Sequence, residues 1–371
     1  NLQNNIVGLE ASRLFARSEI NMGVDAFRDS LYAMLKRNTF LNIKFENMLD
    51  TLGEMSRTDL YSYLKEWEQL TPLPFYSIGE PELTKVVNKG GEEFFVLKVL
   101  VSNNSDYDGI IQMNVLQNGW WYQPMEDPRA RKKVEIAAHT SKEFVSVWEE
   151  QIRDVEINTM VSGNLPYMIR QSIGNVKQER NKIVKDTIYT LPESSLEMPG
   201  EVIVDNEDST LFVLSTPAVV GLLPKWLDKV EDTSFKYSGI SWWRAPLQWT
   251  ATTNAKYYGK YIRSAYVIKS GDGSQTATWK IPVPEAGQYE LYYHVFKDDE
   301  LRWNDRLQGE YHFRVAYDSE MEDAYINLRK ANEGWEQLGT YYFSADTVRV
   351  VLTDECKLRS VTADAVKIVK R

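Results

Sequence analysis

The chain contains little cysteine, little histidine and no long apolar run. Cys356 is the single cysteine among 371 residues, so the sequence has neither an internal disulfide nor a zinc site built from thiolates. No apolar run approaches the ~18 residues that would cross a bilayer, and membrane insertion is therefore not predicted. The net charge of −10 argues against nucleic acid as a partner, because phosphate binding needs clustered Lys and Arg.

Motifs of the common enzyme classes are missing as well. The three histidines lie in AAHTSKEF, YYHVFKDD and YHFRVAYD, and none of them begins the HExxH pattern of zinc peptidases. The sequence also lacks a GxSxG elbow, a P-loop and a GxGxxG turn. The acidic clusters Asp298-Asp299-Glu300 and Glu320-Glu322-Asp323 are typical of solvated turns. We therefore predict no cofactor, no metal and no enzymatic activity for the chain as given.

Aromatic residues are abundant by contrast. The chain has 11 Trp and 21 Tyr, most densely packed between Trp242 and Trp335. Such side chains serve both core packing and the recognition of flat ligands. In QYELYYHVF, alternation places Tyr289, Leu291, Tyr293 and Val295 on one face of a strand, which is predicted to face a core. Trp249, Trp279 and Trp335 are likewise predicted to fill a core.

The spacing of apolar residues changes along the chain. Residues 1–75 have helical spacing, as in DAFRDSLYAMLKR, where Phe27, Leu31, Met34 and Leu35 form one stripe. From Tyr76 the period is two, which predicts an antiparallel, Ig-like β-sandwich over residues 76–175. Residues 176–200 are polar and predicted to be a linker. Residues 201–371 contain further strand-like runs and predict a jelly-roll-like β-sandwich. The expected fold class is α+β and multidomain, with a small N-terminal helical unit.

Four elements in a fixed order support a family resemblance for residues 201–371. ATW, PEAGQYELYY, GWEQLG and ADAV follow one another between Ala277 and Val366. In this order the segment resembles the golvesin C-terminal-like domain, also known from xanthan lyase and classed with carbohydrate-binding β-sandwiches. One departure from the family pattern is an insertion over residues 209–249. The resemblance implies a module that binds a polysaccharide or a cell-surface glycan.

The helical segment has a second resemblance. The stretch from GVDAFRDSLYAMLKRNTF to DLYSYLKEWEQLTPLPFYSI is similar in cadence to the C-terminal helices of aminopeptidase N-type, thermolysin-like metallopeptidases. In that family the zinc ligands precede these helices, so zinc is expected only if upstream residues carry HExxH. The chain starts NLQNNIVGLE, without Met, which is expected of a piece of a longer protein.

One single tryptophan and one pair of tryptophans lie in polar segments beside strands. Trp303 stands in KDDELRWNDRLQGE, and Trp242 and Trp243 cannot both face one core if they lie on a strand. Each ring either contacts a ligand or packs within the chain, and both alternatives remain open. The predicted glycan-binding residues are Trp303, Trp242, Trp243, Arg302, Asn304, Asp305 and Arg306.

The function expected from the sequence is that of a non-catalytic C-terminal portion of a secreted, metallopeptidase-like protein that binds a glycan. One alternative is a surface adhesion protein without peptidase ancestry. Another is an enzyme with an unrecognised site between domains. The type of the C-terminal module implies an extracytoplasmic location, whether periplasmic, cell-surface or secreted.

Overall fold

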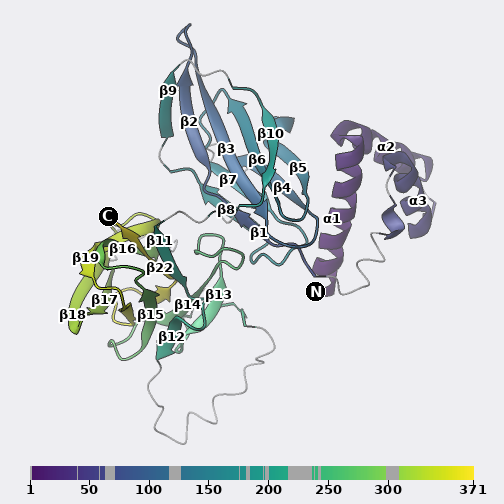
Figure 1. Ribbon diagram of the computed structural model, residues 1–371. Coiled ribbons are helices and arrows are strands. Elements are labelled where there is room, and N and C mark those ends of the chain that lie inside the picture. The colour runs from purple at the N-terminus through teal and green to yellow at the C-terminus, as the bar shows by residue number, and fades with distance from the viewer. Residues whose placement is uncertain are drawn as a thin grey trace, which may run out of the picture. The chain divides into compact units, whose positions relative to one another are not determined.

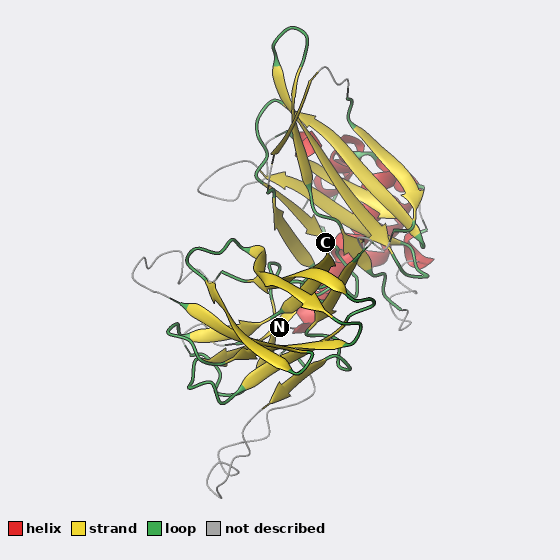
Figure 2. Cartoon of the chain, turned by 60° about the vertical axis from the view of Figure 1, so that its left-hand side comes forward, coloured by secondary structure: helices red, strands yellow, loops and turns green. Residues whose placement is uncertain are grey.

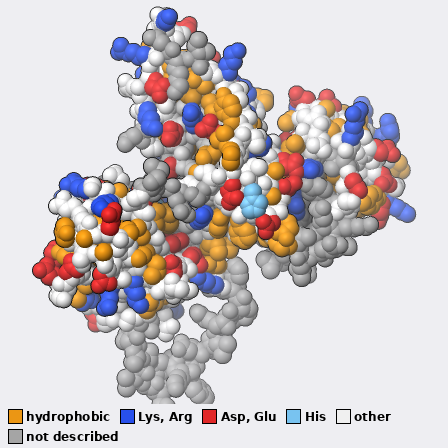
Figure 3. Space-filling view, in the orientation of Figure 1, with side chains coloured by type: hydrophobic (Ala, Val, Ile, Leu, Met, Phe, Trp, Pro, Cys, Tyr) orange, Lys and Arg blue, Asp and Glu red, His pale blue; other side chains and the backbone are white. Residues whose placement is uncertain are grey.

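The structure is a computed structural model that describes residues 2–39, 41–57, 59–62, 72–116, 127–174, 176–180, 184–194, 196, 200–215, 236–237, 239–240, 244–297 and 309–371. It divides into two compact units, unit 1 from Asn1 to Leu196 and unit 2 from Glu197 to Arg371. Strands dominate both units, and the helices found among these residues belong to unit 1 (Figures 1 and 2). Acidic, basic and apolar side chains are interspersed over the surface seen in Figure 3.

Unit 1 begins with three helices, α1 (Leu2–Met22), α2 (Val24–Arg37) and α3 (Phe45–Ser56). Gly23 joins α1 to α2 with a φ of 85°, a conformation that a glycine adopts without steric cost. The apolar stripes of the helices meet in one small core. Its buried members are Leu14, Phe27, Leu49, Leu52 and Leu60.

Helix α1 also packs against strands of unit 1. Ala16 and Ile20 of α1 contact Ile110 and Met160 in a second small core. Two ion pairs flank this contact, Glu19 with Lys133 and Arg17 with Glu135. The helical segment thus does not stand apart from the β region that follows it.

The strands of unit 1 form a six-stranded sheet and a four-stranded sheet. The first has the order β10-β6-β3-β2-β9, with β1 paired to β3, and the second the order β5-β4-β7-β8. Residues 176–200, expected to be a linker, supply β9 and β10 to the six-stranded sheet. The bounds are β1 (Tyr76–Ile78), β2 (Glu82–Val87), β3 (Glu93–Asn103), β4 (Gly109–Leu116), β5 (Arg131–Ile136), β6 (Thr140–Trp148), β7 (Asp154–Asn158), β8 (Met168–Ser172), β9 (Val176–Arg180) and β10 (Thr187–Pro192), with a 3₁₀ turn at Pro128–Ala130.

Unit 2 contains sheets of four, five and three strands. Their orders are β11-β22-β16-β19, β12-β15-β20-β17-β18 and β13-β14-β21. The bounds are β11 (Glu201–Asp205), β12 (Phe212–Ser215), β13 (Thr250–Thr253), β14 (Ser264–Lys269), β15 (Thr276–Pro282), β16 (Gly287–Val295), β17 (Glu310–Tyr317), β18 (Glu320–Asn327), β19 (Gly334–Phe343), β20 (Thr347–Thr353), β21 (Ser360–Ala363) and β22 (Ala365–Lys370).

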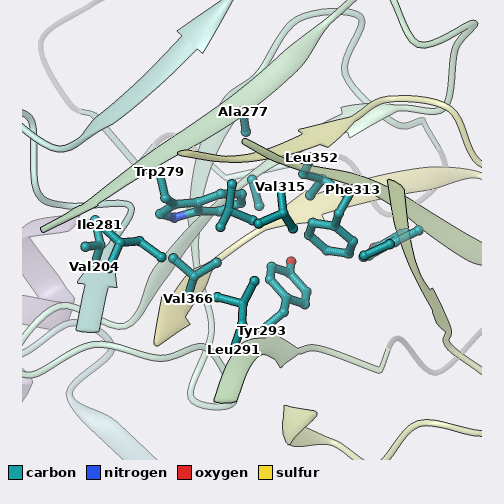
Figure 4. Close-up of a cluster of buried hydrophobic side chains, with 14 of the residues drawn as sticks. Val204, Ala277, Trp279, Ile281, Leu291, Tyr293, Phe313, Val315, Leu352 and Val366 are labelled. Atoms are coloured by element: carbon teal, nitrogen blue, oxygen red, sulfur yellow. The ribbon is translucent and has the colours of Figure 1, made fainter. Parts of the chain in front are cut away.

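The core of unit 2 is rich in aromatic rings (Figure 4). Trp279 is fully buried, with its ring tilted against Phe212 and edge-on to Tyr293, and it donates its indole N–H to the carbonyl oxygen of Asp364 at 3.2 Å. Tyr293 donates to the carbonyl of Thr362. The polar atoms of these rings are therefore hydrogen-bonded although they are buried, as a stable core requires.

The predicted fold class is wrong. The chain is mostly β, and the strands of the described residues form five sheets instead of an Ig-like sandwich followed by a jelly roll. In unit 1, β2 and β9 pair in parallel, which an all-antiparallel sandwich does not contain. In unit 2, twelve strands are divided among three sheets, whereas a jelly roll has eight strands in two. Alternation marks a run as a strand, but it does not reveal the partner with which that strand pairs.

Candidate functional site

The residues predicted to bind a ligand cannot be placed. Trp242 and Trp243 fall in the segment 241–243, and Trp303 in the segment 298–308, both outside the described residues. The same holds for the four polar residues predicted around Trp303, which are Arg302, Asn304, Asp305 and Arg306. Their role stays a prediction, and the candidate site is built from the residues that the structure describes.

Strand β16 has a core face and an outer face. Tyr289, Leu291, Tyr293 and Val295 are at most 1% exposed, so the core face predicted for this strand is confirmed. The residues between them point the other way, because side chains alternate along a strand. Tyr292 and His294 are accordingly only partly buried and lie on the outer face of the sheet β11-β22-β16-β19.

A β-bulge in β19 brings Trp335 onto the same outer face. Leu291 of β16 is opposite Gly339, but the next residue, Tyr292, is opposite Gln337. Leu338 is therefore an extra residue in β19, and it reverses the alternation of every residue before it. Trp335 lies opposite His294 and shares its face, whereas Phe343, beyond the bulge, is buried.

The rings on this face gather around Trp335. The centroid of Trp335 lies 5.1 Å from that of His294 and 5.0 Å from that of Tyr258, which precedes β14. The ammonium nitrogen of Lys367 lies over two rings, 4.9 Å from the centroid of Trp335 and 5.4 Å from that of Tyr292. Cations favour such positions because the ring face is electronegative. We call Tyr258, Tyr292, His294, Trp335 and Lys367 the aromatic face.

A buried carboxylate, that of Asp364, lies beneath the aromatic face and forms hydrogen bonds with two of its residues. Asp364 is fully buried, and its two oxygens lie 3.1 and 3.2 Å from the backbone nitrogen of Tyr258. Its Oδ2 also lies 2.8 Å from Nδ1 of His294, which fixes the direction of the imidazole ring. Burial raises the pKa of Asp364, while His294 opposes that rise. Nearby Asp205 likewise has a raised pKa, through burial and the charge of Asp364.

The loop that carries Tyr258 depends on a glycine. Gly259 has a φ of 151°, and a Cβ at this position would overlap the backbone carbonyl of Ile262. Only glycine fits there without a shift of the backbone. The sequence YYGKYIR thus holds the ring of Tyr258 beside His294 and Trp335.

The charges of this face are paired. Lys367 donates to Glu201 Oε1 at 3.0 Å, and Arg371 donates to Glu290 Oε1 at 2.9 Å. Tyr292 donates its hydroxyl to the other oxygen of Glu290 at 2.6 Å. This bond and the one from Arg371 lower the pKa of Glu290, and the same carboxylate raises the pKa of Tyr292. The face therefore presents partly exposed rings beside neutralised polar groups.

The described residues contain no group of three or more His, Cys, Asp or Glu side chains that could hold a metal ion. Cys356 is partly buried, and burial raises the pKa of its thiol. No described helix is both long enough and apolar enough to cross a membrane.

The prediction for the three core tryptophans is correct for two. Trp279 is fully buried and Trp249 is 8% exposed, whereas Trp335 is only partly buried and lies on the outer face. Without a bulge, alternation along β19 would place Trp335 on the same side of the strand as Phe343. The bulge places Trp335 on the opposite side. The bulge could have been predicted from Gly339, the interior glycine of GWEQLGTYYF, because glycine inside a strand often indicates a bulge.

Comparison with solved structures gives only weak likenesses. A β-glucuronidase from Bacteroides uniformis matches with 13% identity over 85% of this chain and 32% of that chain, at a TM-score of 0.23. An exo-β-1,3-galactanase from Phanerochaete chrysosporium matches with 6% identity over 78% of this chain and 68% of that chain, at a TM-score of 0.28. The Sulfolobus Turreted Icosahedral Virus structure matches with 10% identity over 81% and 94%, at 0.17. The chain thus spans about a third of the β-glucuronidase that it matches.

These matches correct one prediction without assigning an activity. Two of the matched structures are glycosidases, so the prediction that the chain is not an enzyme is withdrawn. At such TM-scores, the likeness assigns neither a fold nor a reaction to this chain. None of the curated proteins compared with the chain matches it.

Comparison with family models separates the two resemblances that the sequence suggested. The aminopeptidase N-type resemblance of the helical segment has no support among the comparisons. The C-terminal resemblance is confirmed over part of its predicted range. The family model of the Golvesin C-terminal domain matches residues 242–370, the part of the chain that carries the whole aromatic face.

Proposed function

We propose that unit 2 binds a saccharide on the aromatic face. The observation that carries the proposal is the position of Trp335, a partly exposed ring that a β-bulge turns out of the core. A large aromatic side chain gains most free energy when buried, so a sequence that keeps one outside leaves apolar area for a ligand to cover.

The chemistry of the face suits a sugar ring. Pyranoses have apolar C–H faces that stack on aromatic rings, while their hydroxyls need hydrogen-bond donors and acceptors at the rim. Trp335 and Tyr292 supply ring faces, and Lys367, Glu201 and Glu290 supply the polar groups. Since these charges are already paired, the face favours a neutral sugar. We expect a dissociation constant on the order of 0.1–1 mM, because one stacked ring and a few exposed hydrogen bonds leave little net energy.

The residues predicted from the sequence are kept as a second part of this proposal. Trp303 follows His294 of the aromatic face by nine residues in the chain. Trp303 with its polar neighbours, and Trp242 with Trp243, are therefore proposed as additional contacts of a longer glycan. The ligand would be a polysaccharide or a cell-surface glycan, which implies an extracytoplasmic location.

Affinity electrophoresis of the whole chain against a panel of neutral polysaccharides tests the proposal. Trp335→Ala should abolish retardation by any polysaccharide that retards the wild type. The matched control is Tyr325→Ala, which removes a ring 55% exposed on β18, in a different sheet, and should leave retardation unchanged. Lack of retardation of the wild type by the whole panel would overturn the proposal. Equal losses in both variants would do so too.

A further inference from the structure

The outer face of the sheet β12-β15-β20-β17-β18 carries a group of basic side chains on neighbouring strands. Lys280 of β15 lies directly opposite Arg349 of β20. Arg349 in turn lies opposite Ala316 of β17, two residues from Arg314, so the two arginines are diagonal neighbours. Side chains at such positions are about 5 to 8 Å apart at Cβ, within reach of one another. We call Lys280, Arg314 and Arg349 the cationic face.

These three side chains have no acidic partner among the described residues. Within the part of the chain that the structure describes, none of the three side chains forms an ion pair or a hydrogen bond, and Nε of Arg314 is buried without an acceptor there. The nearest carboxylate in register, that of Asp323 opposite Arg314, lies 2.7 Å from Nε2 of His312. The aromatic face differs, because there Lys367 and Arg371 are each held by a glutamate.

Such an arrangement costs stability. Like charges directly opposite each other on adjacent strands are destabilising, and Lys280 and Arg349 form such a pair. Unpaired Lys often protects edge strands from aggregation, but β15, β20 and β17 are all interior strands of their sheet. Protection of an edge therefore does not explain these residues. A chain with a net charge of −10 also has no need of added cations for solubility.

We propose that the cationic face binds the anionic groups of an acidic polysaccharide. Guanidinium groups pair with carboxylate or sulfate in bidentate geometry, and a lysine adds a third contact. Val351 lies opposite Arg314 on one side and opposite Thr278 on the other, so uncharged, partly exposed side chains adjoin the three cations on this face. The choice of a saccharide rests on the proposed function, but the site is on a different sheet and uses different residues.

The proposal is tested by affinity electrophoresis of the whole chain in gels that contain polygalacturonate, dextran sulfate or neutral dextran. The double variant Lys280→Gln/Arg349→Gln should bind the acidic polymer on the order of tenfold more weakly or worse, because two ion pairs are lost. Its melting temperature should stay the same or rise, since a like-charge pair has been removed. Retardation by polygalacturonate alone identifies carboxylate as the anion, and retardation by dextran sulfate alone identifies sulfate.

Two control variants separate this site from its alternatives. Lys177→Gln removes one positive charge from unit 1, and Trp335→Ala removes the ring of the aromatic face. Both should keep full binding to the acidic polymer. An equal loss in Lys177→Gln would show general ion exchange and overturn the proposal, as would a wild type that no acidic polymer retards. Loss of acidic-polymer binding in Trp335→Ala but not in the double variant would refute the cationic face and leave the proposed function intact. A further gel contains single-stranded DNA, and retardation in that gel with none in the two acidic polysaccharides would also overturn the proposal.

Discussion

Two tryptophans of unit 2 offer a direct test of the β-bulge in β19. Replacing Trp279 with Ala removes a fully buried ring and its hydrogen bond to Asp364, for which we expect a cost of about 3–5 kcal/mol. Replacing Trp335 with Ala removes a partly exposed ring whose main contacts are Lys367, Tyr258 and His294, for which we expect about 0.5–1.5 kcal/mol. Because the substitution is chemically the same at both positions, the difference between the two losses of stability measures how deeply each ring is buried.

Calorimetry of the whole chain measures this difference. For a unit of this size, 1 kcal/mol corresponds to about 2–4 °C, so Trp279→Ala should lower the melting temperature of unit 2 by about 6–20 °C and Trp335→Ala by a few degrees. Trp148→Ala, which removes a ring 2% exposed in unit 1, identifies the transition that belongs to the other unit. If Trp335→Ala destabilises unit 2 as much as Trp279→Ala, then the ring belongs to the core and the account of the bulge fails.

Two further predictions concern pH and close packing. Burial raises the folded-state pKa of Asp364, so the folded chain keeps a proton that the unfolded chain releases, and the stability of unit 2 should fall as pH rises from about 4 through that pKa. Asp364→Asn should flatten part of this fall in thermal unfolding, and an unchanged profile would contradict the assignment. A Cβ at Gly109 would overlap the hydroxyl of Tyr76, so Gly109→Ala should lower the melting temperature of unit 1. In calorimetry the transition of unit 2 should not move, and a joint shift of both transitions would contradict the division into two units.

Local alternation in the sequence predicted much of unit 2 correctly. The strand runs and the core face of β16 followed from period-two spacing, which is a property of neighbouring residues. Trp335 was misplaced because one extra residue at Leu338 reverses the alternation, and the pairing that creates the bulge involves a strand more than 40 residues away. The sheet partners were missed for the same reason, as in the parallel pairing of β2 with β9.

The family resemblances differed in what carried them. At the C-terminus, the resemblance rested on short sequence elements in a fixed order, in which both turn residues and strand residues are of particular types. The match of the family model over residues 242–370 confirms the resemblance there. The helical segment offered only apolar spacing and breaks, which any amphipathic helices share. The ligand residues around Trp303 were predicted because an aromatic ring is unusual within a polar segment. A ring that a bulge turns outward lies among ordinary strand residues, so its exposure is not evident from the residues beside it in the sequence.

The pairing of β22 has a consequence for how unit 2 is made in the cell. Val369 of β22 lies opposite Glu201 of β11 and Glu290 of β16, so β22 is the strand that joins them. During translation at about 5–20 residues per second, β11 waits roughly 10–30 s for this partner to be synthesised. Over that interval the backbone amides of β11 are open to other strands, and one edge of β16 is open from its own synthesis until that of β22. The nascent chain is therefore exposed to wrong strand pairing for longer than a protein whose strands pair with near neighbours in the sequence.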